Sequence, residues 1–322
     1  MKRILLVDSD GKIPNIALMK LAAMHKGRRN AVKLVRLGMG YYPPNRPKFI
    51  LANNFNRAYV STLFTPNRGL VVVKGCKVMY GGTGNDLHTT LPNSAEACNP
   101  DYSVYPDFNY SVGFISRGCI RKCSFCLVPE KEGKLKQVEN PVNIIKHKKV
   151  LFLDNNFLAL KNHAKLLSVI AKTGASFQFN QGLDARLLTE RTAKLLAKAK
   201  RWGALYFAYD LTVLKKSIEP SLRMMAKKIP VWSMRVYLYA HPSQGPSDIS
   251  YRVRFCLKYK ILPYVMRDLV CWKDSDSNFW VDLASWANQP ALIKNLSFQT
   301  FLRRRHPKKE QRQKASLKLY EE

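Results

Sequence analysis

Three cysteines within eight residues are the part of this sequence best suited to chemistry. Cys119, Cys123 and Cys126 have the spacing C-x3-C-x2-C, and three basic residues flank them: Arg117, Arg121 and Lys122. Three thiols this close cannot all pair with one another, and thiolates are ligands for zinc and for iron–sulfur clusters. The flanking cations favour the ionised thiolates. The motif therefore predicts a metal site with one coordination position left open.

Three kinds of site compete for these thiols. A structural zinc site takes four ligands, often as two C-x2-C pairs, and the other cysteines are single, at positions 76, 98, 256 and 271. A redox dithiol would use Cys123 and Cys126 and leave Cys119 without a role. An iron–sulfur cluster held by three thiolates uses all of them. Cys256 and Cys271 are expected to be buried or loop thiols instead of ligands.

The charge of the chain predicts an anionic partner. The 322 residues include 54 Lys and Arg against 22 Asp and Glu, a formal net charge of +32, and 46% are hydrophobic. This hydrophobic content is that of a globular protein, and such a positive field attracts polyanions. Basic residues are densest at 146–149 and 303–318. We expect RNA or DNA as a partner, and a solvated basic surface is the alternative.

The sequence also bears on location. No run reaches the roughly 18 apolar residues that a membrane span needs. The apolar stretch at the N-terminus stops at Asp8, too early for a signal peptide. We therefore expect a cytoplasmic protein with no membrane partner, in which the seven cysteines are not expected to form a disulfide framework.

Residues 1–87 are expected to form an α/β domain that precedes the cysteine motif. The pattern predicts a strand at 4–7, a helix at 14–26, and further strands at 31–37, 49–52, 59–63 and 77–80, with 69–73 open between helix and strand. The glycine-rich run at 81–86 lacks full G-x-G-x-x-G spacing, so we interpret it as a tight turn in preference to a ligand loop. Residues 88–110 lack periodicity and are predicted to be a linker.

Residues 111–270 alternate regularly between strand and helix. The predicted strands are 112–115, 150–153, 177–180, 204–209, 231–238 and 261–266, and the predicted helices are 163–172, 190–201, 220–228 and 247–259. Such alternation predicts a parallel sheet with helices on its outer face, two units short of an eight-stranded barrel. Residues 271–322 are predicted to be C-terminal helices, at 280–287 and 291–302, and a short basic tail.

Polar side chains recur where these strands end, and the carboxyl ends of parallel strands are where ligands bind. Taken alone, each residue is more often a helix cap or a turn former. Their recurrence at five consecutive strand ends indicates a common ligand-binding rim, which includes Asp154, Asn155, Asn156, Gln181, Asp184, Tyr209, Arg235 and Met266.

The cysteine motif after the first strand of a parallel array resembles that of the radical S-adenosylmethionine (radical SAM) enzymes, over about residues 111–270. The resemblance implies a partial (β/α)6 barrel and a four-iron, four-sulfur (4Fe-4S) cluster held by Cys119, Cys123 and Cys126. It also implies an open iron that chelates S-adenosylmethionine, and an external one-electron reductant whose electron releases a 5′-deoxyadenosyl radical. Phe125, the aromatic before the third cysteine, would lie near the adenine.

The chain departs from the family pattern at the second strand end. Asp154-Asn155-Asn156 stands where the family has Gly-Gly-Glu, and an oxygen there would hold the methionyl amino group. Four residues are assigned to ribose, carboxylate or substrate contacts by position only: Gln181, Asp184, Tyr209 and Arg235. Met266 joins this cofactor-binding set as the end of the last strand. No catalytic residue is assigned.

The N-terminal domain resembles the Rossmann-like domain of cobalamin-dependent members. Their D-x-H-x-x-G signature is absent, because Asp8-Ser9-Asp10-Gly11 has no matching histidine, so cobalamin is the less favoured cofactor. The tRNA methylthiotransferases carry three cysteines in their first domain. Only Cys76 and Cys98 precede the motif here, which disfavours that group.

The leading hypothesis is a radical SAM enzyme that modifies a polyanionic substrate, with a nucleic-acid base as the candidate. Two alternatives stay open. One is a non-catalytic nucleic-acid-binding protein with a structural metal. The other is a radical SAM enzyme that modifies a small molecule or a peptide.

Overall fold

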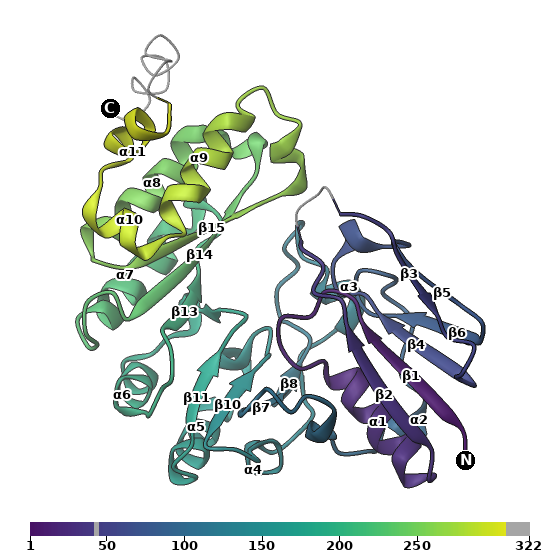
Figure 1. The fold of residues 1–322 in the computed structure, drawn as a ribbon. Coiled ribbons are helices and arrows are strands. Elements are labelled where there is room, and N and C mark those ends of the chain that lie inside the picture. Colours follow the sequence, from purple (N-terminus) through teal and green to yellow (C-terminus); the bar gives the residue numbers. More distant parts are fainter. Residues whose placement is uncertain (42–44, 307–322) are drawn as a thin grey trace. The chain divides into compact units, whose positions relative to one another are not determined.

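The computed structural model describes residues 1–41 and 45–306, and the basic tail predicted beyond residue 306 lies outside them. The chain divides into two compact units (Figure 1). The smaller unit contains residues 1–112 and 121–133, and the larger unit contains residues 113–120 and the chain from 134 onward. Both are mixed α/β structures with parallel sheets, as the alternation of elements predicts.

The smaller unit contains a four-stranded sheet of order β2-β1-β4-β6, in which the three neighbouring pairs are parallel. Its strands are β1 (Arg3–Asp8), β2 (Ala31–Arg36), β4 (Arg57–Ser61) and β6 (Lys77–Gly81). Strand β1 is buried on both faces. Ile4 and Leu6 pack with helix α1 (Ile16–Gly27), and Leu5 and Val7 pack with a second apolar cluster. The apolar run of β1 therefore makes it an interior strand.

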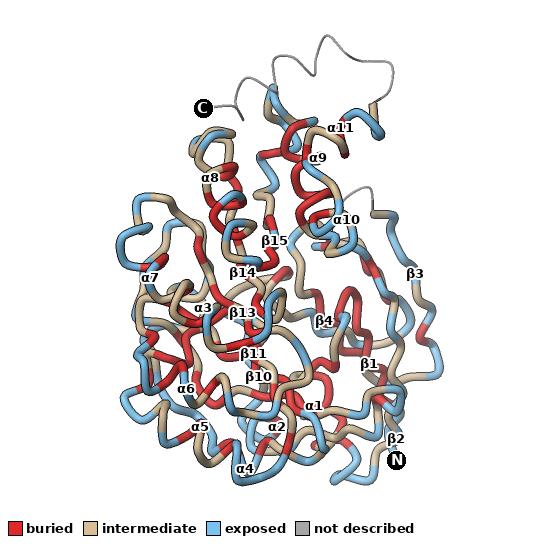
Figure 2. Tube along the Cα trace, turned by 90° about the vertical axis from the view of Figure 1, so that its left-hand side faces the viewer, coloured by how far each residue is buried: buried red, intermediate tan, exposed pale blue. Residues whose placement is uncertain are grey.

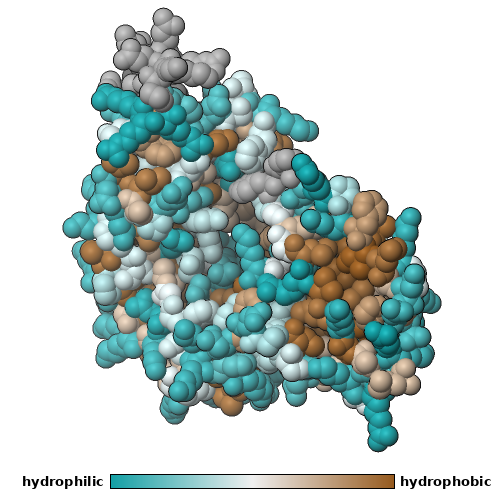
Figure 3. All heavy atoms as spheres, in the orientation of Figure 1, coloured by the Kyte–Doolittle hydropathy of each residue, from teal (hydrophilic) through white to brown (hydrophobic). Residues whose placement is uncertain are grey.

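Two further strands, β3 (Lys48–Leu51) and β5 (Val71–Lys74), form a separate parallel pair. The sequence pattern did not decide between helix and strand for residues 69–73. The structure shows that this segment contains a strand, as its β-branched valines favour. Figure 3 shows apolar residues gathered on the surface of the smaller unit near these strands. Phe49 and Leu51 of β3 are 73% and 78% exposed.

The glycine-rich run is a tight turn, as predicted. A Cβ atom on Gly82 would lie 2.3 Å from the Thr62 carbonyl oxygen, and one on Gly84 would lie 2.5 Å from the Phe64 carbonyl carbon. The Gly84 amide donates to the Thr62 carbonyl at 3.0 Å. Glycine is required here because the turn lies directly on the backbone that follows β4.

The segment predicted to be a linker is more ordered than expected. It contains the short helix α2 (Asn93–Glu96), and Tyr105 is only 1% exposed. The Tyr105 hydroxyl donates to the Asp8 carboxylate at 2.8 Å. Residues 88–110 therefore pack within the smaller unit instead of spanning between domains, because aromatic side chains in the segment have a buried surface to cover.

The larger unit holds its long strands in two sheets, in which the pairs β10-β11, β12-β13, β13-β14 and β14-β15 are parallel. One has the order β11-β10-β7 and the other has the order β12-β13-β14-β15. The strands are β7 (Ser111–Gly113), β10 (Lys149–Phe152), β11 (Ser176–Phe179), β12 (Leu183–Asp184), β13 (Leu205–Ala208), β14 (Met234–Ala240) and β15 (Leu262–Arg267). A short antiparallel pair, β8 (Ser116–Arg117) with β9 (Lys136–Gln137), follows β7.

Helices alternate with these strands and cover one face of them, as Figure 1 shows for α6, α7 and α8 beside β13 to β15. The helices of this unit are α4 (Pro141–Ile144), α5 (His163–Lys172), α6 (Glu190–Lys198), α7 (Lys215–Ala226), α8 (Gly245–Lys258), α9 (Ser277–Ala287), α10 (Pro290–Asn295) and α11 (Phe298–Arg305). Between helices and strands lies one continuous apolar core, seen as buried segments in Figure 2. Helix α3 (Val128–Glu132) belongs to the smaller unit.

Two helix predictions need correction. Helix α7 begins at Lys215, five residues before the predicted start, and contains Pro220 in its interior. The helix predicted over 291–302 is broken at Leu296, where the backbone is extended and Ser297 caps α11 by accepting from the Thr300 amide at 3.1 Å. Within residues 1–41 and 45–306, we find no helix with the length and apolar character to cross a lipid bilayer.

Candidate metal centre and ligand site

The cysteine loop follows β8 and turns at Gly118, whose φ of 81° is one that glycine adopts readily. All three thiols are half-buried. Cys119 belongs to the larger unit, whereas Cys123 and Cys126 belong to the smaller one, where the Cys126 amide donates to the Cys123 carbonyl at 3.0 Å. Phe125, directly before Cys126, is half-buried. Among the described residues, no group of three His, Cys, Asp or Glu is held ready for a metal ion, so the three-thiol site stays a prediction.

Asp154, which follows β10, is hydrogen-bonded to the chain that leads into the cysteine loop. Its carboxylate accepts the Ile115 amide at 3.1 Å, the Ser116 amide at 2.6 Å and the Ser116 hydroxyl at 2.7 Å. Burial raises the pKa of this carboxyl to about 6. Through these three bonds Asp154 positions the chain that leads into the loop.

Asn156 lies two residues further on and contacts the motif directly. Its side chain is 2% exposed, and its Nδ2 donates to the Cys119 sulfur at 3.4 Å. Its Oδ1 is buried and has no hydrogen-bond partner among the described residues. An unsatisfied buried acceptor costs about 1–3 kcal/mol, so this oxygen is poised to accept a bond from a ligand. Asn155, between the two, is half-buried.

The third strand end carries an ion pair. Asp184 accepts three bonds from Arg186, from the backbone amide at 3.2 Å, from Nε at 2.6 Å and from Nη2 at 2.9 Å, and is 8% exposed. Gln181 is exposed, and Met266, in β15, is half-buried. The Nε of Arg235 is buried and meets no hydrogen-bond partner in the described part of the chain. Its guanidinium carbon lies 5.9 Å from the centre of the Tyr264 ring.

Tyr209 is a core residue instead of a rim residue. It is fully buried, its ring packs edge-to-face with Phe255, and its hydroxyl donates to Glu219 at 2.9 Å. The Asp210 carboxylate accepts the Tyr239 amide at 3.2 Å, and burial raises its pKa to about 6. Both residues hold the end of β13 against its neighbours.

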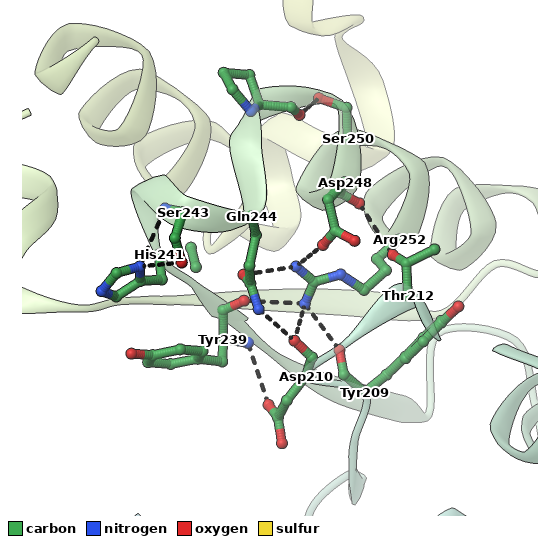
Figure 4. A network of polar contacts seen from close by, with 12 residues as sticks. Tyr209, Asp210, Thr212, Tyr239, His241, Ser243, Gln244, Asp248, Ser250 and Arg252 are labelled. Atoms are coloured by element: carbon green, nitrogen blue, oxygen red, sulfur yellow. Dashed lines mark hydrogen bonds and ion pairs between the residues drawn. The ribbon is translucent and has the colours of Figure 1, made fainter. Parts of the chain in front are cut away.

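Arg252, on α8, joins the ends of β13 and β14 (Figure 4). Its Nη1 donates to the carbonyls of Tyr209 at 3.1 Å, Asp210 at 2.9 Å and Tyr239 at 2.9 Å. Its Nη2 donates to Gln244 and Asp248 of the segment that follows β14, and the side chain is fully buried. Sequence reasoning missed this residue, because a single arginine in an amphipathic helix looks like a surface residue.

Comparisons with known proteins leave the family of the chain open. No protein-family model matches it, and no curated protein matches it. Among solved structures, it is similar to the crystal structure of Streptococcus suis SuiB bound to precursor peptide SuiA, with a TM-score of 0.42 and 16% identity. The match covers 62% of this chain and 47% of that chain, so the likeness spans less than half of SuiB. A likeness this low carries no argument about function.

Proposed function

We propose that this protein is a radical SAM enzyme whose cluster is held by Cys119, Cys123 and Cys126. The observation that carries the proposal is the setting of Cys119 in the larger unit. The C-x3-C-x2-C loop begins after the first strand of a parallel series. Asn156, at the end of the second, bonds the Cys119 sulfur and keeps one buried oxygen unsatisfied within the described chain. Polar groups that orient the metal ligands and the molecule bound at the open coordination position are typical of such sites.

The donor set fits an iron–sulfur cluster. Three half-buried thiols supply three soft ligands. Metal binding is commonly coupled to the ordering of the loop that carries the ligands, so the thiols need not be assembled beforehand. When bound, such a cluster supplies the electron that cleaves S-adenosylmethionine reductively, with an external reductant as the source.

The residues of the chain would bind and orient the cofactor. The Asn156 Oδ1 would accept a hydrogen bond from the methionyl ammonium of the bound cofactor, at the strand end where the family pattern has Gly-Gly-Glu. The carboxylate of Asp154 holds the loop in position through Ile115 and Ser116. We further propose that β7, β10, β11, β13, β14 and β15 form one curved partial barrel, because they follow chain order within two sheets whose pairs β10-β11, β13-β14 and β14-β15 are parallel.

Metal analysis tests the cluster. Anaerobic reconstitution with iron and sulfide should load about four of each per chain, and Cys119→Ala, Cys123→Ala and Cys126→Ala should each lose most of the cluster. Cys98→Ala is the matched control, because Cys98 is also half-buried but donates to the Ser94 carbonyl at 3.2 Å. Zinc without iron or sulfide would contradict the proposal and favour a structural metal site.

The role of Asn156 is tested separately by cofactor affinity. Asn156→Leu keeps the volume and removes the unsatisfied oxygen, so we expect S-adenosylmethionine to bind about 10- to 150-fold more weakly, as for a hydrogen bond to a charged group. Asn162→Leu, at an exposed helix end, is the control. The measurement is equilibrium dialysis on variants of equal iron content. Unchanged affinity in Asn156→Leu would contradict the assignment.

A further inference from the structure

One face of the sheet β13-β14-β15 carries aromatic and basic side chains. Along β14, Met234, Val236 and Leu238 are buried in the core, whereas Arg235, Tyr237 and Tyr239 alternate with them and are only half-buried. The parallel register places further residues on the same side as these three: Tyr206 opposite Arg235, and Tyr264 opposite Tyr237. We call this set of five residues the tyrosine face.

The rings of the tyrosine face form a connected series. Tyr206 and Tyr237 are stacked, with centroids 5.3 Å apart and an interplanar angle of 27°. Tyr237 and Tyr264 meet edge-to-face, with centroids 5.7 Å apart. The middle ring is fixed, because its hydroxyl donates to the Asn180 carbonyl at 2.7 Å and the chain at Gly182 lies close against it. A Cβ atom on Gly182 would lie 3.0 Å from this ring.

The tyrosine face is not explained by the packing of the larger unit. Its four tyrosines are absent from the apolar core, which does include Tyr209. Tyr264 is 37% exposed although it lies in the middle of a strand. The interior of a parallel barrel is usually filled by branched aliphatic side chains, which need no hydrogen-bond partners. Aromatic rings with polar edges indicate a surface for a flat ligand.

The charge of the face indicates that the ligand is anionic. Arg235 stands beside Tyr206 and Tyr264, and its buried Nε has no hydrogen-bond partner within the described structure. The chain carries a formal net charge of +32. Aromatic rings that stack bases, combined with arginines that meet phosphates, are how proteins bind single-stranded nucleic acid.

We propose that the tyrosine face binds unpaired bases of single-stranded nucleic acid, with bases stacked on the outer rings Tyr206 and Tyr264, which Tyr237 holds in place between them, and a phosphate at Arg235. This proposal gives the substrate class of the proposed radical SAM enzyme. It rests on the proposed function only for the reaction that follows binding, because nucleic-acid binding itself requires no cluster. A duplex fits poorly, since its bases are already stacked on one another. An acidic peptide presents flat rings only at its aromatic residues, whereas every nucleotide carries a base.

The proposal is tested by measuring how the full chain, without iron–sulfur reconstitution, binds fluorescently labelled 12-nucleotide RNA and DNA strands. Binding is measured by fluorescence anisotropy. Base stacking contributes about 1–3 kcal/mol per base, so Tyr206→Leu and Tyr264→Leu should each weaken binding about 5- to 150-fold. Arg235→Gln should lower the salt dependence of log K by about 0.7. Tyr80→Leu, in the smaller unit and 41% exposed, is the matched control and should bind as the wild type does.

Tyr264→Phe separates stacking from folding, because it keeps the ring and should retain wild-type affinity. The proposal is supported whether the RNA strand or the DNA strand binds more tightly, and the tighter of the two indicates which nucleic acid is the substrate. Equal binding of a duplex, or wild-type affinity in both leucine variants, would overturn it. Failure of these tests leaves the cluster and cofactor measurements unaffected, so the two proposals fail independently.

Discussion

Replacement of Arg252 by methionine should destabilise the larger unit strongly. The substitution removes a fully buried guanidinium and leaves the carbonyls of Tyr209, Asp210 and Tyr239 without their shared donor. It also leaves Asp248 without its ion-pair partner. Breaking a buried, hydrogen-bonded pair typically costs about 3–5 kcal/mol. For a unit of this size, that loss lowers the melting temperature by about 6–20 °C.

Tryptophan fluorescence is the appropriate assay, because all five tryptophans lie in the larger unit. Thermal and urea unfolding of Arg252→Met would be compared with those of Arg254→Met, a substitution two residues along the same helix at an exposed site. The control should change the free energy of unfolding by less than about 0.5 kcal/mol. If the two variants unfold alike, Arg252 does not hold the strand ends together and the reasoning is wrong.

Two other predictions concern stability. Burial raises the pKa of Asp154 from 3.8 to about 6, so the folded state binds this proton more tightly than the unfolded state does. Protonation of Asp154 therefore adds to the free energy of unfolding at low pH, and this contribution is lost as pH rises from about 4 to 6. Asp154→Asn should flatten that part of the pH profile in urea titrations followed by tryptophan fluorescence, and an unchanged slope would contradict this. Gly84→Ala should destabilise the smaller unit by about 1–3 kcal/mol, because its Cβ would lie 2.5 Å from the Phe64 backbone. Gly27→Ala is the control and should not destabilise the unit in this way, because a Cβ atom on Gly27 would meet no atom within 4 Å. Equal melting temperatures of the two variants, measured by far-ultraviolet circular dichroism, would refute the prediction.

The alternation of strands and helices was predictable because it depends on local pattern. Helix α5 has the predicted bounds, His163–Lys172, since its apolar residues recur at helical spacing. The start of α7 was not predictable. Proline is common at a first helical position, which suggested a start at Pro220, but Ile218 is buried in the core and extends the helix toward its N-terminus. Tertiary packing decided this boundary.

The positions of the site residues were predicted better than their roles. Asp154 and Asn156 were both found from their place after a strand, yet one bonds the backbone of Ser116, 38 residues earlier, and the other meets Cys119. No local pattern encodes such distant partners. Tyr209 was assigned to the rim by the same reasoning, but its side chain points into the core.

The tyrosine face shows what sequence reasoning lacks in a parallel sheet. Arg235 was assigned to the rim from one predicted strand, but Tyr206 and Tyr264 come from the two neighbouring strands. Only the register, which pairs Tyr206 with Arg235 and Tyr237 with Tyr264, brings them to one side. Register depends on the whole sheet, so a surface built from three strands becomes visible only in the folded chain.

The most direct test of the proposed function is formation of 5′-deoxyadenosine. The protein, reconstituted anaerobically with iron and sulfide, would be incubated with S-adenosylmethionine and dithionite, and the products separated by liquid chromatography. We predict 5′-deoxyadenosine and methionine from the wild type, and from Cys98→Ala, but none from Cys119→Ala. Iron-loaded wild-type protein that forms neither product would contradict the assignment to radical SAM chemistry.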